Sequence, residues 1–222
     1  KFVSESIDAE YELYPLPDIH KLKQLLVSNP LLMGLNVTIP YKKAVVEYLD
    51  SLSPEAEAIG AVNTVVVHRE GDRILLKGWN TDAPAFEAEI TDFAGQQAGN
   101  ALVLGNGGAA LAACYVLRKL GWEIRKVVRK PAMEPENALL YTQVGKEIMD
   151  NTDLIVNATP VGMFPDIHGI PAIPVEYFSS RHSIYDMVYN PEVTRLMEAG
   201  KLRGARIRNG LGMLHKQAGL SW

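Results

Sequence analysis

Two spacings of apolar residues alternate along the chain: short runs, which predict strands, and positions three or four apart, which predict one face of a helix. Up to residue 81, the runs predict strands at residues 10–13, 34–38, 64–68 and 73–77, of which the last two form a hairpin. Helices are predicted to begin at Asp18, Pro40 and Ser53-Pro54. This order of elements favours an α/β fold in which the hairpin is an antiparallel element.

The alternation restarts at residue 101 and becomes more regular. Residues 101–104 predict a buried strand, followed by a glycine-rich turn and a helix that reaches Leu120 and is capped by Gly121. Further strands are predicted at residues 126–128, 154–157, 183–186 and 205–207, and further helices after Asn190-Pro191 and from Leu211. Successive strand-helix-strand units favour a second α/β sheet.

The composition narrows the classes of function. With 47% hydrophobic and 22% charged residues, the chain can bury a core and is not of the disordered class. The formal charge is -4 and no basic block occurs, which argues against a nucleic-acid or membrane-surface partner. The single cysteine, Cys114, lies in an apolar helical run and is interpreted as a buried thiol. We expect a cytoplasmic protein that binds a small molecule and needs no metal ion.

The glycine-rich turn carries the first chemical signal. Gly105, Gly107 and Ala110 occupy the three small positions of a dinucleotide-binding fingerprint. The first glycine permits a tight turn, the second lets the backbone approach a pyrophosphate, and the alanine lets helix and strand pack closely. With Gly108 and Ala109, these residues are expected to hold the cofactor at a helix N-terminus. An isolated match would indicate only a turn, but its place between a strand and a helix favours binding.

The end of the next strand indicates which dinucleotide is bound. In an NAD site a carboxylate usually lies there and binds the ribose hydroxyls, whereas this chain has Arg129 and Lys130. Arg129 could stack on adenine or grip a 2′-phosphate, and Lys130 could add a charge. The two cations therefore favour NADP, and the alternative is that both are solvated loop residues.

Six further segments, spread over nearly the whole chain, are more specific. They are residues 36–42 (NVTIPYK), 60–64 (GAVNT), 80–82 (NTD), 157–163 (NATPVGM), 185–189 (YDMVY) and 209–217 (NGLGMLHKQ). In this order around a dinucleotide turn, they resemble the shikimate dehydrogenase family. The resemblance implies two α/β domains: an N-terminal substrate-binding domain with a mostly parallel sheet and a C-terminal Rossmann-type domain for NADP, with the last helix returning to the first domain.

The resemblance also implies an activity, the reversible reduction of 3-dehydroshikimate to shikimate in chorismate and aromatic amino-acid biosynthesis. Reduction of a ketone requires a hydride donor on one face and a proton donor at the oxygen. In the family, the lysine that matches Lys42 transfers this proton, and the aspartate that matches Asp82 hydrogen-bonds the lysine and the substrate. The alternatives are a solvated helix cation for Lys42 and an ordinary helix N-cap for Asp82.

The same matches imply the remaining site residues. The substrate is expected to contact Thr38, Asn63, Gln217 and Tyr189. The cofactor is expected to contact Thr159, Gly210 and Met213 as well as the glycine-rich turn and the two cations. Each substrate contact has a structural alternative. The alternatives are a strand residue for Thr38, a turn residue for Asn63, a solvated helix residue for Gln217 and a core residue for Tyr189.

The implied substrate-binding domain consists of residues 1–81 and 210–222, and the NADP-binding domain of residues 82–209. Family members begin with a strand and a serine-containing loop that binds the substrate carboxylate, and we expect the chain to lack both, because no such segment precedes Lys1. Residues 131–143 are short for the family's crossover and leave the third strand of the second sheet undefined. A monomer or homodimer is expected.

Three other functions stay open from the sequence. The nearest is a quinate or dual-specificity dehydrogenase that uses NAD, against which Arg129 argues. A non-catalytic ligand sensor on the same fold would not need both Lys42 and Asp82. A bare dinucleotide-binding module would leave the first 80 residues unexplained.

Overall fold

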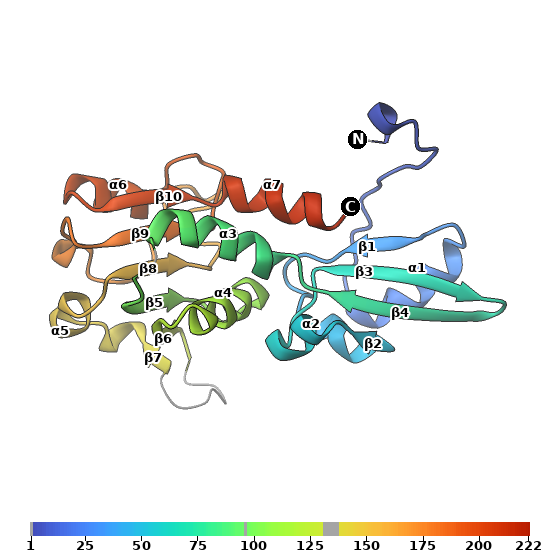
Figure 1. Ribbon diagram of the computed structural model, residues 1–222, viewed down its shortest axis with the longest axis horizontal. Helices are drawn as coiled ribbons and strands as arrows, with labels where there is room; N and C mark the ends of the chain where they lie inside the picture. Colours follow the sequence, from blue (N-terminus) through green and yellow to red (C-terminus); the bar gives the residue numbers. More distant parts are fainter. Residues whose placement is uncertain (1, 96, 131–137) are drawn as a thin grey trace. The chain divides into compact units, whose positions relative to one another are not determined.

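The structure, a computed structural model (Figure 1), describes residues 2–95, 97–130 and 138–222. It divides into two units. The smaller unit, Lys1–Leu32, contains the 3₁₀ helices η1 (Val3–Glu5) and η2 (Ile19–Lys21) and the helix α1 (Leu22–Ser28). The helix signal at Asp18 is confirmed, because its carboxylate accepts a hydrogen bond from the His20 amide at 3.0 Å. The strand predicted at residues 10–13 is wrong, since these residues pair with no described strand.

The larger unit, Met33–Trp222, contains two sheets. The first has the order β1-β3-β4-β2, formed by β1 (Gly34–Asn36), β2 (Ser51–Leu52), β3 (Thr64–Glu70) and β4 (Arg73–Trp79). The β1–β3 and β3–β4 pairs are antiparallel, and only the short β2 pairs parallel, with β4. The expectation of a mostly parallel first sheet is therefore wrong for the described strands. The predicted hairpin lies at the centre of the sheet, and the strands of a hairpin run antiparallel.

Two short helical segments connect the strands of this sheet. Helix α2 (Pro54–Ile59) begins as predicted, because the Ser53 hydroxyl accepts a hydrogen bond from the Ala56 amide at 3.1 Å. The α-helix predicted from Pro40 is wrong: residues 39–43 form turns, and a 3₁₀ helix, η3, covers Ala44–Tyr48. Consecutive β-branched residues within η3 lower its α-helix propensity.

The second sheet is parallel throughout and has the order β10-β9-β8-β5-β6-β7. Its strands are β5 (Asn100–Leu104), β6 (Glu123–Val128), β7 (Ala138–Leu140), β8 (Leu154–Asn157), β9 (Ser183–Asp186) and β10 (Arg206–Asn209). All strands predicted for this half are present. Strand β7 supplies the third strand, and residues 131–137 before it lie outside the described residues. The strand order reverses between β5 and β8, where doubly wound sheets bind ligands at the carboxyl ends of their strands.

Helices cover both faces of the second sheet. They are α3 (Asp82–Ala94), α4 (Gly108–Lys119), α5 (Lys146–Asp150), α6 (Arg195–Leu202) and α7 (Leu211–Leu220), with the 3₁₀ helices η4 (Tyr141–Gln143) and η5 (Val175–Tyr177). Ala101 and Val103 of β5 belong to the core with α3 and α4, whereas Leu102 and Leu104 belong to the core with α5 and α6. This alternation follows from the two-residue period of a strand.

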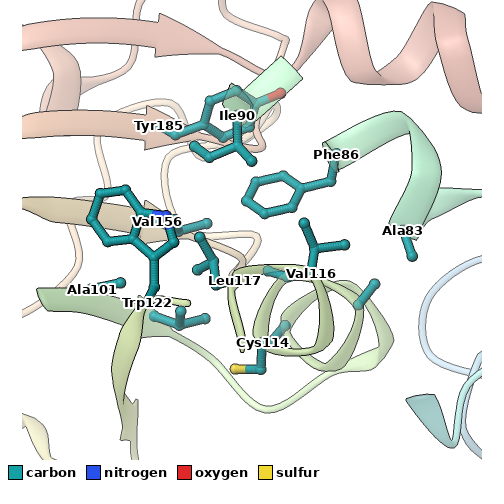
Figure 2. Packing of buried hydrophobic residues seen from close by; sticks show 14 of the residues in the cluster. Ala83, Phe86, Ile90, Ala101, Cys114, Val116, Leu117, Trp122, Val156 and Tyr185 are labelled. Carbon is teal, nitrogen blue, oxygen red and sulfur yellow. The ribbon is translucent and has the colours of Figure 1, made fainter. Parts of the chain in front are cut away.

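The first of these cores is built around aromatic side chains (Figure 2). The Phe86 ring of α3 meets the Tyr185 ring of β9 edge-on, with 5.4 Å between their centroids. Cys114 is buried in α4 in the same core, as its apolar surroundings predicted. Ala83 and Phe86 belong to this core, so the core fixes the first turn of α3, which begins at Asp82.

Candidate active site

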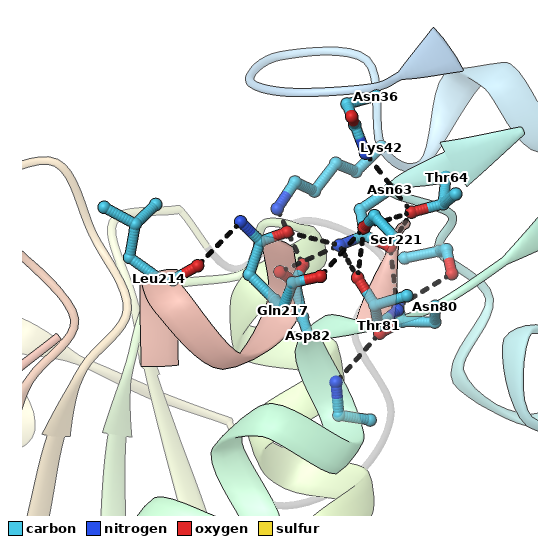
Figure 3. Close-up of polar contacts among 12 residues, drawn as sticks. Asn36, Lys42, Asn63, Thr64, Asn80, Thr81, Asp82, Leu214, Gln217 and Ser221 are labelled. Atoms are coloured by element: carbon cyan, nitrogen blue, oxygen red, sulfur yellow. Dashed lines mark hydrogen bonds and ion pairs between the residues drawn. The ribbon is translucent and has the colours of Figure 1, made fainter. Parts of the chain in front are cut away.

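Polar side chains gather where β3, the start of α3 and the end of α7 meet (Figure 3). The buried members of this cluster are Asn63, Thr64, Asn80, Thr81 and Asp82. Buried polar groups are stable only when they are hydrogen-bonded, so the pairing within this cluster decides which groups are left to react.

The central contact is an ion pair between Lys42 and Asp82. Lys42 Nζ lies 2.6 Å from Asp82 Oδ2, and the two side chains are 17% and 5% exposed. Lys42 lies in the turns after β1, and its carbonyl accepts a hydrogen bond from the Val62 amide at 2.8 Å, which fixes the backbone below the ammonium. The Lys42 ammonium is therefore a partly accessible hydrogen-bond donor, and it is held in place by a buried carboxylate and a fixed backbone.

Asp82 does not cap α3. The first turn is capped by Asn80 instead, whose Oδ1 accepts a hydrogen bond from the Ala83 amide at 3.0 Å. The Asp82 carboxylate is thereby free to pair with Lys42 through Oδ2, while Oδ1 accepts a hydrogen bond from Asn63 Nδ2 at 3.1 Å. The structural alternative for Asp82, an ordinary N-cap, is therefore wrong.

Asn63 links three elements of the cluster. Its Nδ2 also donates to Thr81 Oγ1 at 2.8 Å, and its Oδ1 accepts from the Thr81 amide at 2.8 Å. These bonds fix the orientation of the carboxamide, because each polar end has a partner of the opposite kind. Asn63, which the sequence predicts as a substrate contact, thus lies in the cluster and orients Asp82.

Helix α7 and its C-cap residue contribute one side chain each. Gln217 Oε1 lies 3.5 Å from Asn63 Nδ2, which confirms that the last helix returns to this region. Ser221 Oγ lies 2.9 Å from Thr64 Oγ1 and 3.0 Å from Thr81 Oγ1. The sequence reasoning did not select Ser221 or Thr81. Thr81 could have been found from the NTD segment, whereas no local pattern marks the serine.

Two predicted substrate residues lie outside this hydrogen-bonded cluster. Thr38 is exposed, and its carbonyl accepts from the Tyr41 amide in a turn. Tyr189 is 43% exposed, so its alternative as a core residue is wrong. Within the described part of the chain, neither side chain hydrogen-bonds a member of the cluster.

The glycine-rich turn lies at the point where the strand order of the second sheet reverses. Gly105 has a φ of +115°, and a Cβ there would lie 3.1 Å from the Ala158 carbonyl oxygen after β8, so both conformation and space require glycine. Gly107 precedes α4 with no side-chain cap, and a Cβ there would meet nothing within 4 Å. An open approach to an uncapped helix N-terminus suits a pyrophosphate.

The turn also touches the catalytic candidate. A Cβ on Gly108 would lie 2.6 Å from Lys42 Cβ. Residues from the two sheets therefore approach each other here, and only glycine leaves room for the lysine stem. This contact brings the predicted proton donor next to the predicted dinucleotide site.

Thr159 follows β8 and is held next to the turn by a chain of hydrogen bonds. Its hydroxyl donates to Asn157 Oδ1 at 2.6 Å, and Asn157 Nδ2 donates to Asp186 Oδ1 at 2.9 Å. Asp186 is fully buried, and burial raises the pKa of its carboxyl to about 6, while hydrogen bonds from Thr194, Val188 and Asn157 oppose the rise.

The other predicted cofactor contacts lie in three places. Gly210 lies against the Met187 carbonyl, and Met213 belongs to the core between α3 and α4. Arg129 and Lys130 follow β6 and are exposed. Burial raises the pKa of the Tyr141 hydroxyl, and the charge of Arg129 opposes this rise, which places the guanidinium near η4. In the described ranges neither cation forms an ion pair with a carboxylate, so both can meet a phosphate.

Over the described residues, no helix combines the length and apolarity needed to cross a membrane. Three or more His, Cys, Asp or Glu side chains do not gather anywhere in that part of the chain in a way that could hold a metal ion.

Comparison with known proteins agrees with this geometry. The shikimate dehydrogenase substrate binding domain profile matches residues 1–65. The NADP(+) shikimate dehydrogenase of Carboxydothermus hydrogenoformans is 39% identical over 201 residues, which cover 85% of this chain and 70% of that protein. Shikimate 5-dehydrogenase from Thermus thermophilus, solved with NADP(H) and shikimate, is 34% identical, with a TM-score of 0.82 over 99% of this chain and 83% of that chain.

A relative with another substrate is also similar. Quinate dehydrogenase from Corynebacterium glutamicum, solved with NAD, is 29% identical, with a TM-score of 0.74 over 89% of this chain and 74% of that chain. The relative from Carboxydothermus hydrogenoformans is more similar in sequence and matches most of both chains. This chain therefore belongs to the shikimate dehydrogenase family, as its six sequence segments predicted.

Proposed function

We propose that the chain is an NADP-dependent oxidoreductase that interconverts 3-dehydroshikimate and shikimate, a step in chorismate and aromatic amino-acid biosynthesis. The observation that carries the proposal is the Lys42 and Asp82 ion pair, 2.6 Å long and next to the glycine-rich turn. A dehydrogenase needs a hydride donor at the carbonyl carbon and a proton donor at the carbonyl oxygen. The contact of Lys42 with the glycine-rich turn brings the candidate proton donor next to the candidate dinucleotide site.

The chemistry divides between the cofactor and the chain. The bound dinucleotide supplies or accepts the hydride at the reacting carbon. Lys42 Nζ holds the proton that the ketone oxygen receives in reduction and takes it back in oxidation. Asp82 Oδ2 holds Nζ in position at 2.6 Å, and Asn63 holds the other carboxylate oxygen at 3.1 Å. The lysine can therefore neutralise a developing alkoxide without first reorienting.

The remaining residues are assigned to binding. For the substrate we assign Thr38, Asn63, Gln217 and Tyr189, with the polar cluster and helix α7 as their support. For NADP, the fit rests on the open Gly107, the uncapped start of α4 and the exposed Arg129 and Lys130 near η4. Other assigned cofactor contacts are Gly105, Gly108, Ala109, Ala110, Thr159, Gly210 and Met213.

We assign residues 1–81 and 210–222 to substrate binding and residues 82–209 to NADP binding. The profile match over residues 1–65 supports the first assignment, as does the bond of Ser221 to Thr64. Packing of α3 in the core of the second sheet supports the boundary at residue 82. A cytoplasmic location and a monomer or homodimer complete the proposal.

One assay tests the proposed function. The chain is incubated with shikimate or quinate and with NADP⁺ or NAD⁺, and the absorbance of the reduced nicotinamide is followed. We expect the highest kcat/KM for shikimate with NADP⁺. A preference for quinate with NAD⁺ would support the alternative that the Corynebacterium glutamicum relative represents. Binding of both ligands without turnover would support a sensor.

A further inference from the structure

The hydroxyl of Ser221, the C-cap residue of α7, lies where three elements meet (Figure 3). Its Oγ lies 2.9 Å from Thr64 Oγ1 of β3 and 3.0 Å from Thr81 Oγ1, directly before α3. It also donates to the Gln217 carbonyl at 2.9 Å, one turn earlier in α7. Both threonines are buried, so the serine hydroxyl links two buried hydroxyl groups to the end of the helix.

The directions of these hydrogen bonds follow from what a hydroxyl can do, which is to donate one bond and accept two. Thr81 Oγ1 accepts from Asn63 Nδ2 at 2.8 Å, so the proton of Thr81 can point to Ser221 Oγ. Ser221 then accepts from both Thr81 and Thr64 and donates to the Gln217 carbonyl, which uses its full capacity. A continuous line of hydrogen bonds therefore runs from Asn63 through Thr81 and Ser221 to α7.

This line sets the distance between two carboxamides of the site. Gln217 Oε1 lies 3.5 Å from Asn63 Nδ2, which is at the long limit of a hydrogen bond and holds the helix only weakly. Lys216 ties α7 to Glu89 of α3, on the side of the second sheet. The bonds of Ser221 are the shorter ones that reach β3, so they fix Gln217 relative to Asn63.

We propose that Ser221 is a positioning residue for the substrate: its hydroxyl fixes the spacing between Gln217 and Asn63, the two carboxamides assigned to shikimate. The proposal rests on the proposed function of the site. Ser221 acts through these two side chains and does not itself contact the substrate. Without the hydroxyl the buried Thr81 proton loses its acceptor and the end of α7 loses its link to β3, so the two carboxamides are no longer held at one distance.

Ser221→Ala removes the hydroxyl and keeps the Cβ. We expect the KM for shikimate to rise roughly 5- to 10-fold, as for the loss of one hydrogen bond. The kcat should fall much less, because the Lys42 and Asp82 ion pair remains, and the Kd for NADP⁺ should stay unchanged. Ser221→Thr keeps the hydroxyl and should restore the KM. The matched control is His215→Ala, an exposed position of α7, for which no change is expected.

Steady-state kinetics, a calorimetric titration with NADP⁺ and thermal unfolding give these quantities. An unchanged KM in Ser221→Ala would overturn the proposal, and so would a KM in Ser221→Thr as high as in Ser221→Ala. A lower melting temperature with similar losses in KM, kcat and NADP⁺ binding would also overturn it, since the serine would then support the fold in general. Failure of the unmutated chain to turn over shikimate would reject the proposed function first, which distinguishes the two failures.

Discussion

At the scale of single residues, the Lys42 and Asp82 pair buries the carboxylate and leaves the ammonium partly accessible to a substrate. Asp82 is held through both oxygens, by Lys42 and by Asn63, and only the lysine reaches solvent to an appreciable degree. A buried pair of this kind contributes less to stability than its short distance suggests, because both charges have been desolvated. Its value lies in presenting a fixed donor at the place where charge develops.

We therefore expect Lys42→Met to reduce kcat by roughly 10²- to 10⁴-fold, the usual contribution of a general acid or base. Methionine keeps much of the side-chain length, so the dissociation constant for shikimate should change much less. The matched control is Lys43→Met, which removes an exposed neighbouring ammonium and should leave kcat unchanged. Steady-state kinetics and a shikimate titration measure both quantities. Wild-type turnover in the Lys42 variant would return this residue to the status of a structural cation.

Cofactor choice is also a property of single residues. Arg129→Ala should raise the Kd for NADP⁺ by a factor on the order of 10 to 100, since a hydrogen bond to a charged group contributes roughly 1.5–3 kcal/mol. The Kd for NAD⁺, which lacks the 2′-phosphate, should hardly change. Arg125→Ala removes an exposed guanidinium from β6, the strand that Arg129 follows, and serves as the control. Equal losses for both dinucleotides would argue against a contact with the 2′-phosphate.

At the scale of elements, helix α7 must reach the polar cluster from the second sheet. Its C-terminal half is fixed by three residues: Lys216 forms an ion pair with the buried Glu89 of α3, and Gln217 and the C-cap residue Ser221 bond to the cluster. The turn before α7 is equally constrained. A Cβ on Gly210 would lie 2.2 Å from the Met187 carbonyl oxygen, which is backbone and cannot rotate away.

Gly210→Ala should therefore lower the free energy of unfolding by roughly 1–3 kcal/mol, or more if the backbone cannot adjust. The control lies within α7: a Cβ on Gly219 would meet nothing within 4 Å, so Gly219→Ala should be neutral or stabilise by up to about 1 kcal/mol. Urea denaturation of the three proteins measures the difference. Equal stabilities would contradict the close approach at Gly210.

The elements also show where sequence reasoning succeeds. The central strands β5 and β8 of the second sheet were predicted because buried parallel strands are continuous apolar runs, and the glycine-rich turn marks the strand end at Leu104. The first sheet was predicted with the wrong strand direction. Pairing between β1 and β3 joins residues about 30 positions apart, and an apolar run records burial but not its partner. The strand at residues 10–13 failed for a different reason: Tyr11 and Leu13 are exposed and pair with no described strand, so the apolar positions there did not indicate burial.

The site shows the same division. Lys42, Asp82, Asn63 and Gln217 were all selected, because each lies in a distinctive segment. Ser221 was missed, since its role depends on where the end of α7 lies relative to β3.

At the scale of the whole molecule, the buried Asp186 makes folding depend on pH. Burial raises the pKa of this carboxyl from 3.8 to about 6, against the effect of its three hydrogen bonds. Between these two values the folded chain keeps a proton that the unfolded chain has released. The contribution of Asp186 to stability is therefore fully present below about pH 4 and is lost as the pH rises through about 6.

Asp186→Asn tests this linkage, because an amide resembles the protonated carboxyl and does not titrate. Its oxygen can keep the bonds from Asn157 and Val188, and its NH₂ group can donate to Thr194 Oγ1. The variant should therefore gain stability relative to the unmutated protein as the pH rises from 4 to 7, by up to about 3 kcal/mol. Urea denaturation across this range measures the gain. Asp166→Asn, in an exposed loop, is the control and should show no such trend. A difference between Asp186→Asn and the unmutated protein that stays constant with pH would show that the buried carboxyl is already ionised at pH 4 and that its hydrogen bonds outweigh its burial.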